Sequence, residues 1–112
     1  MDKHYSLESL KEIAGGDTEF MAIVAQAFLE EIPPDLKALT EAVANDNKEL
    51  AYQFAHKMKP NIEMFGISAL KDIAVIESWT RGNKNRSAVA ENIASLNTAL
   101  NHVFGEIKLD FA

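Results

Sequence analysis

The sequence predicts an all-α fold, an antiparallel four-helix bundle with one or two extra short helices. Glycines and prolines divide its 112 residues into pieces of helical length. Within these pieces apolar residues recur three or four positions apart, and no piece alternates apolar and polar residues for long enough to indicate a strand. Short loops between amphipathic helices favour antiparallel neighbours. The breaks fall at Gly15 and Gly16, Pro33 and Pro34, Gly66, Gly82 and Gly105.

The first two predicted helices flank the glycine pair. A short helix over residues 6–14 begins at Ser6 and stops at the glycines. A longer helix begins with Asp17 or Thr18 as its N-cap and ends near residue 32. Its apolar side chains at helical spacing are Phe20, Val24, Ala27 and Phe28.

The proline pair and an acidic pair mark the next two helices. Because proline suits the first turn of a helix, Pro33 and Pro34 predict a new start there. One bent rod that continues the preceding helix is the alternative. Asp46 and Glu49 are spaced as a capping box and predict the start of the following helix, which extends to about Gly66.

The last two predicted helices cover residues 67–80 and 87–107. The first of them stops before the polar segment that starts at Arg81. The second has a regular apolar stripe whose spacing alternates between three and four, as packing in an antiparallel bundle prefers. That stripe consists of Val89, Ile93, Leu96, Leu100, Val103 and Ile107.

Length and charge limit the functional classes. Residues 1–112 have the length of a single domain. The net charge of −6 disfavours nucleic acid and anionic membrane as partners, because phosphate groups demand clustered cations. The absence of cysteine excludes disulfides, thiol nucleophiles and thiolate zinc sites. No signal-peptide core and no membrane-length apolar run occur, so we expect a cytoplasmic protein.

His56 is the first candidate functional residue, because it lies in a helical segment that is rich in apolar residues. With Leu50 set at zero on the helical wheel, the residues from Phe54 to Phe65 that form the apolar stripe point near 70°, and His56 points at roughly 240°. The sequence therefore predicts that His56 lies on the solvent face in the middle of its helix.

Other chemistries find no support in the sequence. Neither His56 nor His102 has the Glu three residues earlier that di-iron bundles use, and no histidine has a second one at i+4. No nucleophile elbow or glycine-rich phosphate loop is present. We therefore expect no metal, no cofactor and no enzymatic ATP chemistry.

The segment "AHKMKPNIEMFG" resembles the histidine-containing phosphotransfer (HPt) family. The resemblance rests on His56, on Lys59 three residues later, and on Gly66 ten residues after the histidine. The flanks agree: "GGD" precedes the second helix, "FLEEIPPDL" joins the second to the third, and an acidic residue lies ten positions before the histidine. The resemblance to the family covers nearly the whole chain.

The resemblance implies a phosphoryl carrier in a two-component phosphorelay. In that role His56 accepts phosphate from a receiver aspartate or a hybrid kinase and passes it to another receiver, which contributes the Mg²⁺. An imidazole that is largely neutral near pH 7 can attack phosphorus. Lys59, one turn on, can reach a phosphate on His56. Tyr52, Pro60 and Glu63, which lie near His56 on the wheel, are the expected docking residues.

Two departures from the family pattern stand close to the histidine, at Pro60 and at Asn61, where a small residue, often serine, is common in the family. Pro60 replaces the usual glycine and has no N–H for the carbonyl of His56, which predicts a kink and a free carbonyl there. Ser78 occupies the expected position of a glutamine that orients the imidazole in some family members. The alternative function is a module of the same fold that binds a receiver or kinase without being phosphorylated. A monomer is expected in either case.

Overall fold

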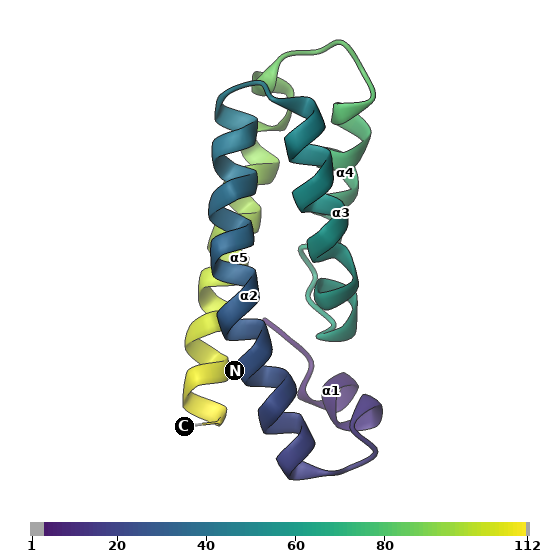
Figure 1. Ribbon diagram of the computed structural model, residues 1–112, viewed down its shortest axis with the longest axis vertical. Coiled ribbons are helices and arrows are strands. Elements are labelled where there is room, and N and C mark those ends of the chain that lie inside the picture. The colour runs from purple at the N-terminus through teal and green to yellow at the C-terminus, as the bar shows by residue number, and fades with distance from the viewer. Residues whose placement is uncertain (1–3, 112) are drawn as a thin grey trace.

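The computed structural model describes residues 4–111, and over that range the chain is all-helical, which confirms the all-α part of the predicted fold class (Figure 1). Within this range no strand is formed. In chain order the elements are α1 (Leu7–Ile13), α2 (Thr18–Ala44), α3 (Lys48–Met64), α4 (Leu70–Thr80), the 3-10 helix η1 (Arg86–Val89) and α5 (Ala90–Asp110).

The four longer helices enclose the core. Helix α2 contacts α3 and α5, and α4 likewise contacts α3 and α5. Successive long helices run in opposite directions along a molecule of 45 × 26 × 19 Å (Figure 1). The side chains between them are fully or almost fully buried, among them Phe28, Leu39, Met58, Ile73 and Leu100.

Helix α1 contacts α2 and α3 and is fixed to the end of α3. The Ser6 side chain caps α1 by accepting from the Ser9 N–H, while the Ser6 N–H donates to the Phe65 carbonyl at 2.7 Å. Gly66 ends α3 with φ +61°, and a Cβ at this position would lie 2.8 Å from the Ser6 Cβ. Glycine is therefore required here both by the backbone conformation and by the close approach of α1.

Helix α2 is one continuous helix of 27 residues that includes Pro33 and Pro34. The continuous rod is thus correct and the new start at the proline pair is wrong. The apolar stripe explains this, because Ile32 and Leu36 on either side of the prolines are both buried. Continuing the helix keeps both side chains in the core, which offsets the lost backbone hydrogen bonds.

The capping box predicted at Asp46 is wrong. Asp46 has φ +53° and belongs to the end of α2, where the N–H groups of Asp46 and Asn47 donate to the carbonyls of Val43 and Ala42. This pairing is a Schellman motif with aspartate in the position that glycine usually occupies. Asn47 instead caps α3, since its side chain accepts from the Leu50 N–H at 3.2 Å.

The apolar face predicted for α3 lies in the core, with Met58, Ile62 and Phe65 fully buried, whereas the buried face of α2 is rotated from the predicted one. In α3 the alanines at 51 and 55 are fully buried, whereas Leu50 is 37% exposed. In α2 Met21 and Ala25 are buried, whereas Phe20 is 44% exposed. Small side chains at the contact let helices approach closely, and this places the larger neighbours at the rim.

Helix α4 begins at Leu70, three residues later than predicted, although Ile67 is buried in the preceding connection. The stripe predicted for the last helix is confirmed, with five of its side chains buried and Ile93 partly buried. Its first turn is η1, which Asn85 caps by accepting from the Ser87 N–H. Within residues 4–111 no helix combines the length and apolar character that crossing a bilayer requires.

Candidate functional site

His56 projects from the middle of α3, and its side chain is 66% exposed. Its neighbours Ala55 and Met58 are fully buried, so the core stripe lies on the other side of the helix. The outward placement of the ring, predicted from the helical wheel, is confirmed. An exposed imidazole is accessible to a partner that closes over it.

Glu77 of α4 lies beneath the imidazole. Its Oε2 atom is 3.5 Å from His56 Nδ1, and its side chain is only 10% exposed. Glu77 follows the fully buried Ile73 by four residues, which places it in the stripe of α4 that faces the core. A carboxylate in an apolar stripe is the sequence signal that could have identified it.

Lys59 shares the same carboxylate. Its Nζ atom lies 3.7 Å from Glu77 Oε1, and its side chain is 41% exposed. Among the described residues Glu77 Oε1 accepts no hydrogen bond, and the ammonium of Lys59 forms an ion pair with it. Glu77 thus serves two groups, a ring and an ammonium, that lie one turn apart on α3.

Tyr52 stacks on the imidazole from the preceding turn. The two ring centroids are 5.4 Å apart and the planes differ by 15°. On Tyr52, in turn, rests the guanidinium of Arg81 at the end of α4, 5.7 Å from the phenol centroid. Tyr52 therefore limits the orientations of the His56 ring and connects it to a cation of the next helix.

Pro60 and Glu63 extend this surface along α3, and both are exposed. Tyr52, His56, Lys59, Pro60 and Glu63 fall within an arc of roughly 100° on the helical wheel. We call these five residues the exposed strip of α3. Helix α3 continues through Pro60 to Met64, so the proline does not end the helix.

Lys57 belongs to another part of the molecule. Its ammonium lies 3.0 Å from Oδ1 of Asp35, a buried residue of α2. A charge-assisted contact of this kind holds α2 and α3 together and compensates the carboxylate for its burial. Lys57 therefore stabilises the fold beside the site, and Lys59 is the lysine next to His56.

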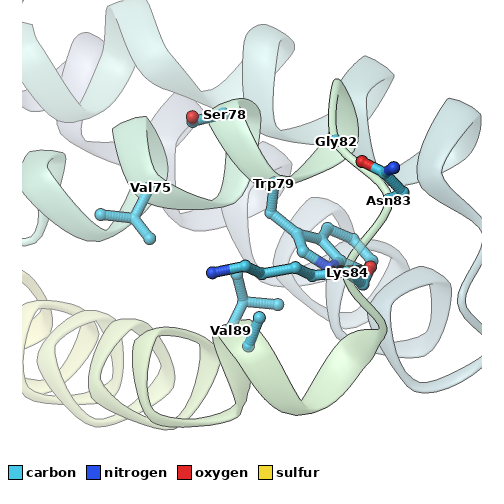
Figure 2. A pocket seen from close by; sticks show the side chains of 8 residues that line it. Val75, Ser78, Trp79, Gly82, Asn83, Lys84 and Val89 are labelled. Atoms are coloured by element: carbon cyan, nitrogen blue, oxygen red, sulfur yellow. Dashed lines mark hydrogen bonds between the residues drawn. The ribbon is translucent and has the colours of Figure 1, made fainter.

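The residue of α4 that lies beside the His56 ring is Glu77, one position before Ser78, the residue expected there. A shift of one residue turns the side chain by about 100°. Ser78 lines a separate cavity of about 400 Å³ together with Val75, Trp79 and Val89 (Figure 2). The indole of Trp79 donates to the Lys84 and Asn85 carbonyls behind this cavity.

The other two histidines are engaged with each other. The His4 and His102 rings stack with centroids 4.3 Å apart, and His4 Nδ1 lies 2.5 Å from Glu106 Oε2. His56 differs because its ring stands beside a lysine on an exposed strip. A nucleophilic ring nitrogen, a carboxylate on the opposite nitrogen and a nearby ammonium suit the transfer of an anionic group.

Comparison with known proteins identifies no relative of the chain. No family model matches the sequence, and neither the curated proteins nor the solved structures give a significant match. Geometry and chemistry therefore carry the functional proposal.

Proposed function

We propose that the chain is a histidine phosphotransfer protein built on an antiparallel four-helix bundle. His56 accepts a phosphoryl group from a receiver aspartate or a hybrid kinase and passes it to another receiver aspartate. The observation that supports this most strongly is the exposed His56 imidazole, whose Nδ1 atom lies 3.5 Å from the buried Glu77 carboxylate. Lys59, on the same carboxylate, completes the arrangement.

The proposed step forms one bond and breaks one bond. When the proton of the ring is on Nδ1, the nitrogen beside Glu77, the lone pair of His56 Nε2 is free to attack the phosphorus of an aspartyl phosphate. The new bond joins Nε2 to phosphorus, and the phosphorus–oxygen bond of the acyl phosphate breaks. The receiver carboxylate departs with that electron pair. The reverse step delivers the phosphoryl group to the next receiver.

Glu77 and Lys59 address the charges that this step creates. The phosphorylated ring keeps its Nδ1 proton and is cationic, so a carboxylate 3.5 Å away stabilises it. The phosphoryl oxygens are anionic, and the ammonium of Lys59 can move from Glu77 towards them. Because this lysine is partly exposed, the movement requires no unfolding of α3.

The remaining chemistry belongs to the partner. In this proposal the receiver holds the Mg²⁺ that neutralises the transferring phosphoryl group, and the chain acts as a carrier without ATP-dependent chemistry of its own. The receiver docks on the exposed strip of α3, where Tyr52, Pro60 and Glu63 surround the histidine. Contacts of this kind are small and transient in signalling pairs.

The test is transfer from a receiver domain loaded with radioactive phosphate. We expect label on the chain that is lost in acid and retained in base, as phosphohistidine requires. His56→Gln should take no label. Failure of every receiver and hybrid kinase of the source organism to label the unmodified protein contradicts the proposal.

A binding module that is not phosphorylated is the second candidate, and Pro60 is the observation that favours it. Its ring stands one turn from His56 on the strip where a receiver active site must close. If the ring blocked the approach of the phosphoryl donor, receivers would bind without transferring phosphate. Receiver binding by the unmodified protein in the absence of label would establish this second function.

A further inference from the structure

A shallow depression opens next to His56, between the start of α3 and the end of α4. Its volume is about 610 Å³. The residues that line it are Lys48, Glu49, Tyr52, Gln53, Thr80 and Arg81. Lys48 and Arg81 are positively charged and Glu49 is negatively charged, so the lining has a net positive charge, and we call it the cationic depression.

The two cations rest on aromatic rings. Lys48 Nζ is 5.1 Å from the Trp79 ring centroid and donates to the Gly82 carbonyl at 2.6 Å. The Arg81 guanidinium lies over Tyr52. Neither cation has a carboxylate within ion-pair distance among residues 4–111. A ring face positions a cation but leaves its charge available to a further anion.

Two lysines of α3 near the depression differ from Lys48 and Arg81 in having carboxylate partners. Lys57 is paired with Asp35 and Lys59 with Glu77, so each of these charges has a carboxylate of the chain itself. The chain as a whole carries a net charge of −6. Two cations without a carboxylate partner make this surface locally complementary to an acidic segment, although the protein as a whole is acidic.

Tyr52 makes the cationic depression continuous with the phosphoacceptor. The Tyr52 ring contacts the Arg81 guanidinium in the depression and also stacks on the His56 ring. We propose that the depression receives an acidic segment of the receiver domain that exchanges phosphate with His56. This inference rests on the proposed function and names the second contact of the same partner.

The proposal assigns Arg81 a role in docking that is separate from chemistry at the ring. Charges at the edge of an interface mainly set the association rate and its salt dependence. Arg81 is exposed, and it caps α4 through its backbone N–H, which no substitution other than proline removes. Arg81→Glu should therefore fold normally and reverse the charge where the acidic segment binds.

The experiment uses a receiver domain that labels His56 in the test above. The second-order transfer rate constant and the rate at saturating receiver are measured at low and high salt. We expect Arg81→Glu to lower the second-order constant about tenfold at low salt and to reduce its salt dependence, with the saturating rate within about twofold. Lys108→Glu, in the last turn of α5, makes the same charge change and should transfer like the unmodified protein. The C-terminal end of α5 lies at the opposite end of the molecule from the segment that follows α4 (Figure 1).

Phosphorylation by phosphoramidate, which needs no receiver, separates docking from ring chemistry. It should be equal in the unmodified protein and in Arg81→Glu. If Arg81→Glu transfers from the receiver at the unmodified rate at low salt, or loses phosphoramidate labelling to the same extent, the docking inference is overturned and the proposed function stands. Absence of receiver-derived label in the unmodified protein contradicts the proposed function itself.

Discussion

His56 and Glu77 meet 3.5 Å apart across the α3–α4 contact, although the histidine side chain is 66% exposed and the glutamate side chain only 10% exposed. The ring is available to a partner, while the carboxylate that faces its Nδ1 atom is shielded from water. A shielded carboxylate interacts more strongly with charge on the ring than an exposed one does. This pair is therefore the feature on which the proposed chemistry depends.

Glu77→Gln should slow phosphotransfer more than it changes stability. The amide of glutamine is neutral, so it does not offset the charge of the phosphorylated ring. We expect a roughly tenfold slower transfer, equivalent to about 1.4 kcal/mol. The free energy of unfolding should change by less than about 1 kcal/mol, because removing a buried charge offsets the lost contacts. Transfer kinetics and urea denaturation measure the two effects.

Asp72→Asn is the matched control for Glu77→Gln. Asp72 is also a buried acid of α4, but it accepts a hydrogen bond from the Asn92 amide of α5 at 3.0 Å. Its substitution should leave transfer unchanged. Equal slowing by both substitutions would mean that the charge on α4 acts at a distance and that Glu77 has no special relation to the ring.

Lys59→Ala and Lys57→Ala should separate transfer from folding. Loss of Lys59 removes the ammonium next to His56, so transfer should fall about tenfold. The stability loss should stay below about 1 kcal/mol, because the contact to Glu77 is long, at 3.7 Å, and Glu77 keeps His56 beside it. Loss of Lys57 leaves the buried Asp35 carboxylate without its partner, so unfolding should become easier by about 1–2 kcal/mol while transfer is retained. The opposite pattern would remove the role assigned to Lys59.

Pro60→Ala should stabilise the protein. The alanine N–H can donate to the His56 carbonyl, and the ring of proline is no longer accommodated inside α3. Alanine also raises the conformational entropy of the unfolded chain, which reduces the gain. We expect the free energy of unfolding, measured by urea denaturation, to rise by about 1–2 kcal/mol. Pro34→Ala in α2 is the control, since it should also stabilise but leave receiver affinity unchanged. Lower affinity in Pro60→Ala alone would support the docking role of Pro60.

Stability should fall in alkali through Tyr5. Burial, followed by the hydrogen bond to Asp110, raises the pKa of Tyr5 above its ordinary value near 10. The folded state therefore keeps the proton longer than the unfolded state. The stabilisation is complete below pH 10 and decreases above it, by at most about 1.4 kcal/mol per pH unit.

Tyr5→Phe isolates this effect from other groups that titrate in alkali. The difference in unfolding free energy between the two proteins should be constant below pH 10 and shrink above it. A difference that stays constant up to pH 12 would show that the Tyr5 pKa does not change on folding.

Helices and core stripes with strong apolar periodicity were predictable, because the pattern in the sequence and the packing in the fold agree. The last helix is the best example, since its stripe from Val89 to Ile107 lies in the core. Gly66 ends α3 as expected, because a residue at φ +61° favours glycine. The outward direction of His56 followed from the same periodicity.

Predictions that required one-residue accuracy were less successful, because neighbouring helices decide the rotation. Asn47 caps α3 in place of Asp46, Met21 is buried in place of Phe20, and Glu77 lies beside the ring in place of Ser78. Each difference is one position, or about 100° of helix rotation. Whether a side chain faces a neighbouring helix depends on how closely the two helices pack, and this is a property of both sequences.

The most direct measurement of the central claim is ³¹P NMR of the chain after incubation with a phosphorylated receiver, in the unmodified protein and in His56→Gln. We predict a signal from phosphorus bonded to Nε2 of His56, and we predict that this signal is absent from His56→Gln. The unfolding free energies of the two proteins should agree within about 0.5 kcal/mol. A phosphorus signal that persists in His56→Gln, or a chain that fails to fold without this histidine, would contradict the account.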